Sequence, residues 1–144
     1  MSGFTLIELI IVIVVIGIMA AVAMFDASPP ELTIPSQAET MASNIRYLQA
    51  TANTGKRTRL VVGATDYTGV ACGSNDCNTN SLVFTVPFHK DIQITSGTGT
   101  IYFDSLGRPT TGPTGYNPAS ASYVIGGQYT VDVTQTTGRV TVTP

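Results

Sequence analysis

A nearly uninterrupted apolar run begins at Phe4 and ends at Phe25, and Glu8 is its single charged residue. An α-helix rises about 1.5 Å per residue, so these 22 residues would form a helix that reaches across the hydrocarbon of a bilayer. An acidic side chain inside such a helix costs a few kcal/mol unless it finds a partner, which makes Glu8 a candidate functional residue. The run therefore predicts a membrane-spanning helix in which Glu8 has a specific partner.

Two other interpretations of the run explain less of it. A secretory signal peptide has a basic start, an apolar core of about 7–15 residues and a small-residue cleavage site, which residues 21–23 (AVA) imitate. The run is longer than such a core, it contains Glu8, and no Lys or Arg precedes it. An ordinary single-pass anchor would account for the length but would leave both Glu8 and the immediate Gly-Phe start unexplained.

The hexapeptide at residues 3–8 (GFTLIE) offers Glu8 a partner. If the chain were cut after Gly3, the new α-amine of Phe4 would be positively charged. It could then pair with Glu8 of a neighbouring subunit that is staggered by about one helical turn. Removing one partner of a buried ion pair costs about 3–5 kcal/mol, so this pair would fix the register between subunits.

This hexapeptide, followed by the apolar run, resembles the processing motif of type IV pilins and type II secretion pseudopilins. The resemblance implies that residues 1–3 are a leader and that a prepilin peptidase cleaves between Gly3 and Phe4 and methylates the new Phe4 amine. It also implies that Glu8 is the glutamate used in assembly. Residues 4–25 would then span the membrane before assembly and form the filament core afterwards.

Prolines follow the apolar run at positions 29, 30 and 35, and they predict a break over residues 26–35. Ser36 and Glu39 then have the spacing of a capping box, which predicts a second helix from Ser36 to Asn53. Its apolar residues recur at spacings of three and four, as expected for one buried stripe. They are Ala38, Met41, Ile45, Leu48 and Ala52.

Beyond Gly55 the apolar pattern alternates, which predicts a sheet. The predicted strands are Arg59–Val62, Ser81–Val86, Ile92–Thr95, Ile101–Phe103, Tyr123–Ile125, Tyr129–Thr134 and Arg139–Thr143. The last two form a hairpin whose turn contains Gly138. Residues 107–118, rich in Gly and Pro, predict a long loop. The sequence thus predicts an α+β fold in which residues 36–144 form one globular head, and the resemblance implies a pilin-like fold with antiparallel sheets.

The composition limits the functions of this head. Only 11% of the residues are charged and the formal net charge is −2, so the chain as a whole lacks the basic footprint of a nucleic-acid-binding protein. Frequent Gly, Thr and Ser without any Trp are typical of an extracellular β-rich domain with many turns.

Cys72 and Cys77 are the two cysteines of the chain, and in a periplasmic or extracellular head they predict a disulfide. A zinc site needs about four ligands, whereas the chain has one histidine. That histidine, His89, stands beside Lys90 and Asp91 without a nucleophile motif or paired carboxylates, which indicates a turn between strands. We therefore expect no enzymatic activity, no cofactor and no metal.

The one basic run contains Lys56, Arg57 and Arg59, close to Arg46 on the predicted helix. Cations are stabilising at a helix C-terminus, which is its ordinary interpretation. Nucleic-acid contact is the alternative, because some FimT-like minor pilins take up DNA and carry a Gly-Arg-x-Arg signature. Residues 138–141 read GRVT and lack the second arginine. A few scattered cations on an acidic chain are a weak basis for binding DNA.

Residues 57–62, 101–108 (IYFDSLGR) and 137–140 (TGRV) resemble the minor-pilin branch that includes pseudopilin H, FimT and MshC. This resemblance implies a minor structural subunit of a type IV pilus or related filament that helps to initiate assembly or presents a tip or surface. A major pilin or a type II secretion pseudopilin is the alternative. The expected partners are other pilin subunits, the prepilin peptidase and, before assembly, the inner membrane. The head would be periplasmic at first and extracellular in the filament.

Overall fold

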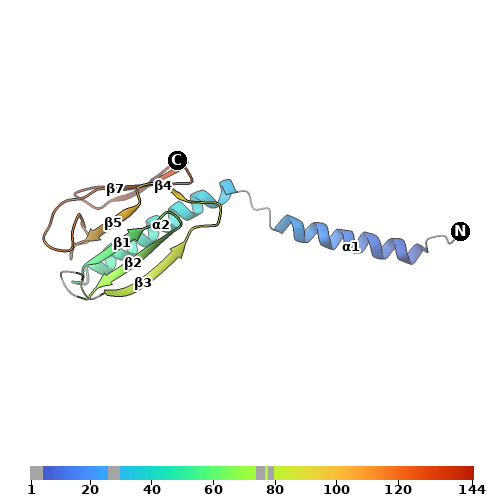
Figure 1. Cartoon of the computed structure of the whole chain (residues 1–144), viewed down its shortest axis with the longest axis horizontal. Coiled ribbons are helices and arrows are strands. Elements are labelled where there is room, and N and C mark those ends of the chain that lie inside the picture. Colours follow the sequence, from blue (N-terminus) through green and yellow to red (C-terminus); the bar gives the residue numbers. More distant parts are fainter. Residues whose placement is uncertain (1–4, 26–29, 74–76, 78–79) are drawn as a thin grey trace.

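The computed structural model describes residues 5–25, 30–73, 77 and 80–144. It contains a long apolar helix, α1 (Leu6–Phe25), and a head in which helix α2 (Pro30–Ala52) packs on two antiparallel sheets. In Figure 1, α1 extends away from the head, whereas α2 lies among the strands. The predicted α+β fold is confirmed.

Helix α1 begins immediately after Thr5, whose carbonyl oxygen accepts hydrogen bonds from the N–H groups of Glu8 at 3.1 Å and Leu9 at 3.3 Å. It ends at Phe25, where the predicted apolar run also ends. Within the described residues, no helix meets the length and apolarity required to cross a membrane.

Helix α2 begins at Pro30, six residues before the predicted start, so the part of the predicted break that covers residues 30–35 is wrong. A proline is tolerated at the first helical position because its missing N–H would have no acceptor there. Pro35 lies inside the helix, where it removes one backbone hydrogen bond. Ser36 is therefore not an N-cap, and its hydroxyl donates to the carbonyl of Thr33 at 2.9 Å. Residues 26–29, the rest of the predicted break, lie outside the described part of the chain.

Packing of Ile34 accounts for the earlier start of α2. Its side chain is only 6% exposed and lies against Gly126, where an added Cβ would come within 3.0 Å of Ile34 Cδ1. Gly126 has a φ of 60°, a conformation that glycine adopts without strain. This contact secures the first turns of α2 despite Pro35, and the predicted apolar stripe continues from it with residues that are all 0% exposed.

The first sheet has five strands in the order β3-β2-β1-β5-β6. Its strands are β1 (Thr58–Val62), β2 (Asp66–Cys72), β3 (Asn80–Pro87), β5 (Gly99–Phe103) and β6 (Pro109–Thr110). The second sheet has four strands in the order β4-β7-β8-β9. Its strands are β4 (Ile94–Ser96), β7 (Ala121–Ile125), β8 (Tyr129–Val133) and β9 (Val140–Thr143). Every pair of neighbouring strands is antiparallel.

The predicted C-terminal hairpin is confirmed, since Val131 pairs with Val142 and Val133 with Val140. Gly138 in its turn has a φ of 66°. Helix α2 contacts strands of both sheets, so one core joins the helix to each of them. Strands β2 and β6 have no counterpart among the predicted strands.

Candidate functional site

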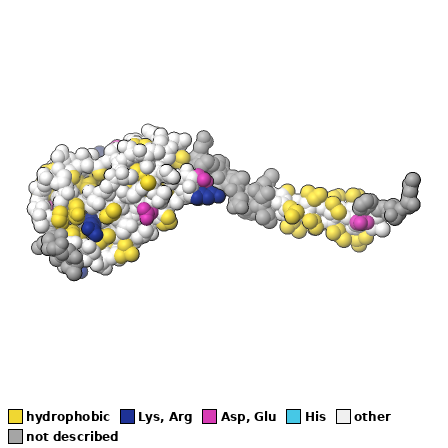
Figure 2. Space-filling view, in the orientation of Figure 1, with side chains coloured by type: hydrophobic (Ala, Val, Ile, Leu, Met, Phe, Trp, Pro, Cys, Tyr) yellow, Lys and Arg dark blue, Asp and Glu magenta, His cyan; other side chains and the backbone are white. Residues whose placement is uncertain are grey.

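The surface of α1 is the most unusual feature of the chain. Every described side chain from Thr5 to Ala20 is exposed, including those of Leu6 at 77%, Ile7 at 68% and Met19 at 70%. Figure 2 shows this helix as a rod covered with hydrophobic side chains, with an acidic group near its N-terminal end. A helix that is apolar on all sides is normally buried, either in a membrane or among other helices.

Glu8 lies in the first turn of α1 and is the acidic residue of that turn. A carboxylate is favourable at a helix N-terminus because the unpaired N–H groups there carry partial positive charge. Its side chain is exposed, as a partner on another subunit would require. Gly3 and Phe4 lie outside the described residues, so cleavage, methylation and the pairing of Phe4 with Glu8 stay predictions.

The predicted disulfide between Cys72 and Cys77 is present, with the two Cα atoms 4.6 Å apart. Cys72 is the last residue of β2, and its N–H donates to the carbonyl of Arg57 at 2.8 Å. Cys77 has a φ of 55°, which is uncommon for a residue with a side chain. The disulfide therefore links the last residue of β2 to Cys77, three residues before β3 begins at Asn80.

The basic run contains one exposed lysine and two arginines that form hydrogen bonds with the head. Lys56 is exposed, whereas Arg57 and Arg59 are half-buried. Arg57 Nη2 donates to the carbonyl of Gly115 at 3.0 Å. Arg59 Nη2 lies 3.1 Å from the side-chain oxygen of Asn80, in the amide orientation that satisfies both groups. Nucleic-acid contact at these residues stays an untested prediction, and two of its three cations have structural contacts.

Arg46, which lies close to this run in the sequence, also has a structural contact. Its Nη2 donates to the carbonyl of Val140 at 3.1 Å and so links α2 to β9. Among the described residues, no group of three His, Cys, Asp or Glu side chains is placed to hold a metal ion. His89 Nδ1 lies 3.8 Å from a carboxylate oxygen of Asp91, and both side chains are exposed.

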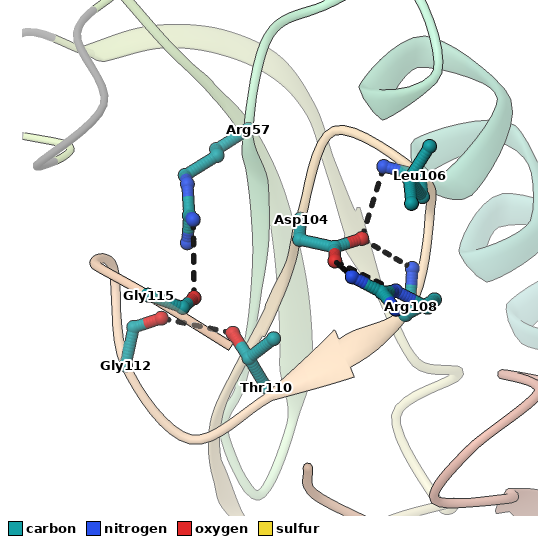
Figure 3. A network of polar contacts seen from close by, with 7 residues as sticks. All are labelled: Arg57, Asp104, Leu106, Arg108, Thr110, Gly112 and Gly115. Atoms are coloured by element: carbon teal, nitrogen blue, oxygen red, sulfur yellow. Dashed lines mark hydrogen bonds and ion pairs between the residues drawn. The ribbon is translucent and has the colours of Figure 1, made fainter. Parts of the chain in front are cut away.

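Sequence reasoning missed a polar network around Asp104, shown in Figure 3. This carboxylate is 4% exposed and accepts hydrogen bonds from the N–H groups of Leu106 at 3.0 Å and Arg108 at 2.8 Å. It also accepts a hydrogen bond from Arg108 Nε at 2.8 Å, and Arg108 Nη2 lies 2.7 Å from the same carboxylate. Burial alone would raise the pKa of Asp104, but the hydrogen bonds from Arg108 and Leu106 and the charge of Arg108 together hold that pKa below its ordinary value. Asp104 is followed three residues later by Gly107, which is a sequence signal for an Asx-turn and could have indicated this network.

The same network holds the loop formed by residues 111–117. Arg108 Cζ lies 3.9 Å from the centroid of the Tyr116 ring, a cation–π contact. The Thr110 hydroxyl donates to the carbonyl of Gly112 at 2.9 Å, and Arg57, the residue before β1, donates to the carbonyl of Gly115 (Figure 3). The long loop predicted over residues 107–118 thus contains strand β6 and a segment held by several polar contacts.

Comparisons with known proteins agree with the motif and the fold. The sequence family described as "Prokaryotic N-terminal methylation motif" matches residues 1–24. No curated protein matches the chain. A solved structure, that of the minor pseudopilin EpsH from the type 2 secretion system of Vibrio cholerae, is similar with a TM-score of 0.56 and 12% sequence identity. The similarity covers 77% of this chain and 96% of the EpsH chain, and it shows a shared fold.

Proposed function

We propose that this chain, whose N-terminal motif and fold support its assignment to the type IV pilin and pseudopilin family, is a minor structural subunit of a type IV pilus or a related filament. The observation that carries the proposal is the apolar helix α1, whose described side chains, up to Ala20, are all exposed, with Glu8 in its first turn. Such a helix gains stability only when other apolar surfaces cover it. Copies of the same helix in a filament would provide that cover.

Assembly would depend on a charge pair between subunits. A prepilin peptidase would cut between Gly3 and Phe4 and methylate the Phe4 amine, which keeps its positive charge. Glu8 of a neighbouring subunit would then accept this amine in an apolar environment, where an unpaired carboxylate is costly. The pair would select one register between neighbouring helices, while their apolar surfaces supply most of the binding free energy.

Before assembly, residues 4–25 would hold the chain in the inner membrane with the head in the periplasm. This location is supported by the length of the apolar run in the sequence and by the methylation motif. After assembly the head would lie at the filament surface or tip, where a minor subunit helps to initiate the filament.

The proposal is tested by the mass of the N-terminal peptide from filaments sheared off cells, together with the abundance of this chain relative to the other filament proteins. A methylated Phe4 terminus at low abundance is the expected result. High abundance would instead identify a major subunit. An N-terminus at Met1 or just after Ala23 would contradict the proposal, because the chain would then be a plain anchor or a secreted domain.

A further inference from the structure

The two ends of the head differ in charge, and helix α2 runs from one end to the other (Figure 1). Near the start of this helix, the Gln37 side-chain oxygen accepts the N–H of His89 at 3.2 Å. We call this the proximal end, because α1 precedes it in the chain. Near the end of the helix, Gln49 Nε2 donates to the carbonyls of Gly107 at 3.2 Å and Gly138 at 2.7 Å. We call this the distal end.

Cations gather at the distal end. Lys56 is exposed and lies between α2 and β1, whose start pairs with the end of β5. Arg108 follows that end of β5, and its guanidinium is held by the buried carboxylate of Asp104. Asp132 is the other acidic residue described in this half of the head. The distal end is therefore net positive, although the whole chain has a formal charge of −2. Six of the seven Lys and Arg residues lie at or next to it: Arg46, Lys56, Arg57, Arg59, Arg108 and Arg139.

An exposed leucine lies among these cations. Leu106 is 65% exposed, and Figure 3 shows it in one turn with Arg108. An added Cβ on Gly138 would come within 3.1 Å of the carbonyl oxygen of Gly107, so the turn that holds Leu106 packs on the turn that ends at the exposed Arg139. Leu106 is thus an apolar side chain on a cationic surface.

A small apolar pocket of about 50 Å³ lies toward the proximal end, between α2 and β3. Asp66 pairs with Pro87 at its edge, and Asp91 lies in the turn that follows β3. Both aspartates are exposed, and the remaining cation of the chain, Lys90, lies beside Asp91. We call this feature the Pro87 pocket. Its lining residues are Gln37, Thr40, Tyr67, Val86, Pro87 and Phe88.

We propose that the heads of two copies of this chain bind end to end, with Leu106 of one copy in the Pro87 pocket of the other. The cations near Leu106 then face Asp66 and Asp91, and this complementary charge orients the two heads. Burial of the leucine side chain supplies affinity. Because the leucine and the pocket lie at opposite ends of one molecule, the contact is heterologous and can repeat along one axis.

This inference rests on the proposed function, in which staggered subunits place one head above the next. Two copies are enough to form the contact, which suits a subunit that helps to initiate a filament. The charge of each end and the presence of one apolar side chain and one apolar pocket are separate observations, and they assign the same pair of surfaces to each other.

A second copy fits the distal end better than a nucleic acid does. Binding to phosphates depends on several free cations, whereas Arg57 and Arg59 are half-buried and Arg108 is paired with Asp104. An exposed leucine gains nothing from a phosphate backbone. Protein interfaces, by contrast, combine an apolar centre with a polar rim, which is the arrangement around Leu106.

The test uses the full chain in detergent micelles, where detergent covers α1. One copy carries Ser105→Cys, at an exposed position beside Leu106, and a differently tagged copy carries Thr40→Cys, at the exposed rim of the pocket. A short bismaleimide joins free thiols and leaves the native disulfide intact. We expect a mixed dimer of the two variants. Thr143→Cys, at an exposed position of the second sheet, replaces Thr40→Cys as the matched control and should not cross-link.

Two leucines separate insertion into the pocket from unspecific apolar contact. Leu106→Ser in the Ser105→Cys copy should slow cross-linking about tenfold or more, because it removes the side chain that fills the pocket. Leu82→Ser is the matched control, since Leu82 is 66% exposed but lies on β3, and it should leave the rate unchanged. Raising the salt from about 0.05 M to about 0.5 M should also slow the reaction, because salt screens exposed charges.

Three results would each overturn the proposal: no mixed dimer, equal cross-linking of Thr143→Cys, or an unchanged rate with Leu106→Ser. Protection of the Ser105→Cys thiol by duplex DNA, without a mixed dimer, would overturn it in favour of a nucleic acid. The substituted positions are exposed, so the variants should fold, and circular dichroism verifies this. The mass of the N-terminal peptide does not depend on this contact, so failure of the inference and failure of the proposed function are distinguishable.

Discussion

Arg108 is held by the carboxylate of Asp104, which lies 2.7 Å from Arg108 Nη2 and also accepts the backbone N–H of the same residue at 2.8 Å. The two residues are four positions apart, and the chain between them turns at Gly107, whose φ is 71°. One buried carboxylate thereby closes this turn and orients the guanidinium over Tyr116.

Asp104→Ala should lower the free energy of unfolding by about 2–4 kcal/mol, because it leaves two partly buried N–H groups and the guanidinium of Arg108 without their acceptor. Urea denaturation followed by circular dichroism measures this change. The control is Asp91→Ala, an exposed site where a change within about 0.5 kcal/mol is expected. Equal stability of the Asp104 variant and the wild type would show that the network does not stabilise the head.

Asp104 should also make the head sensitive to acid. Its folded-state pKa lies below the ordinary value of 3.8, so the unfolded chain binds a proton at a higher pH than the folded chain does. The stability that it contributes is therefore present above about pH 5 and is lost as the pH falls through the folded-state pKa. Urea titrations at about pH 6, 4 and 3 should show a steeper loss for the wild type than for Asp104→Asn. Parallel losses in the two proteins would assign the acid sensitivity to other carboxylates.

Glu8→Ala should leave the N-terminal processing intact yet remove the subunit from filaments, because the Phe4 amine of the neighbour would lose its partner. Immunoblots of sheared filaments measure incorporation, and the mass of the N-terminal peptide from membranes measures processing. Glu39→Ala, at an exposed position of α2, is the matched control and should assemble normally. Normal incorporation of Glu8→Ala would refute the pairing.

Reduction of the disulfide should lower the free energy of unfolding by roughly 2 kcal/mol, since a loop this short restricts the unfolded chain only modestly. The double variant Cys72→Ser, Cys77→Ser should behave like the reduced wild type and should not respond to reductant. A loss well above this value would mean that the bond also holds the edge strand β3 in place.

The chain should not retard double-stranded DNA in a gel at about 0.15 M salt, because Arg57 and Arg59 are half-buried and form hydrogen bonds with the head, and only Lys56 of the three is exposed. The measurement uses the full chain in detergent. A retarded band that Lys56→Gln weakens would contradict this expectation and would support the DNA-uptake alternative, since an exposed lysine can be changed without affecting the fold.

The helical stripe, the C-terminal hairpin and the disulfide could be predicted because each has a local signal in the sequence. Strand β2 could not, since it contains Gly69, which is unfavourable in a strand. The structure supplies the reason: an added Cβ at Gly69 would come within 2.4 Å of the Phe84 ring, so the ring of β3 covers the glycine. The start of α2 likewise depends on the distant contact between Ile34 and Gly126.

In the candidate site, too, some features could be predicted from the sequence and others could not. Glu8 is recognisable from its neighbours in the sequence, and its exposure on α1 agrees with the role expected for it. The hydrogen bond between Arg57 and Gly115 joins residues 58 positions apart, and no local pattern indicates it. For this reason two of the three cations in the basic run form hydrogen bonds within the folded head, which the sequence alone does not indicate.

A filament under tension would pull on the head through Pro30, the first residue of α2. That helix contacts β1, β2 and β5 in one sheet and β8 and β9 in the other, so the load would be shared by both sheets. The force would act largely along the axis of α2. All of the side chains that α2 packs on the sheets would then have to slide at the same time, whereas a force across a sheet would break its hydrogen bonds one after another. Mechanical resistance in this head should therefore reside in the buried stripe of α2, beginning at Ile34.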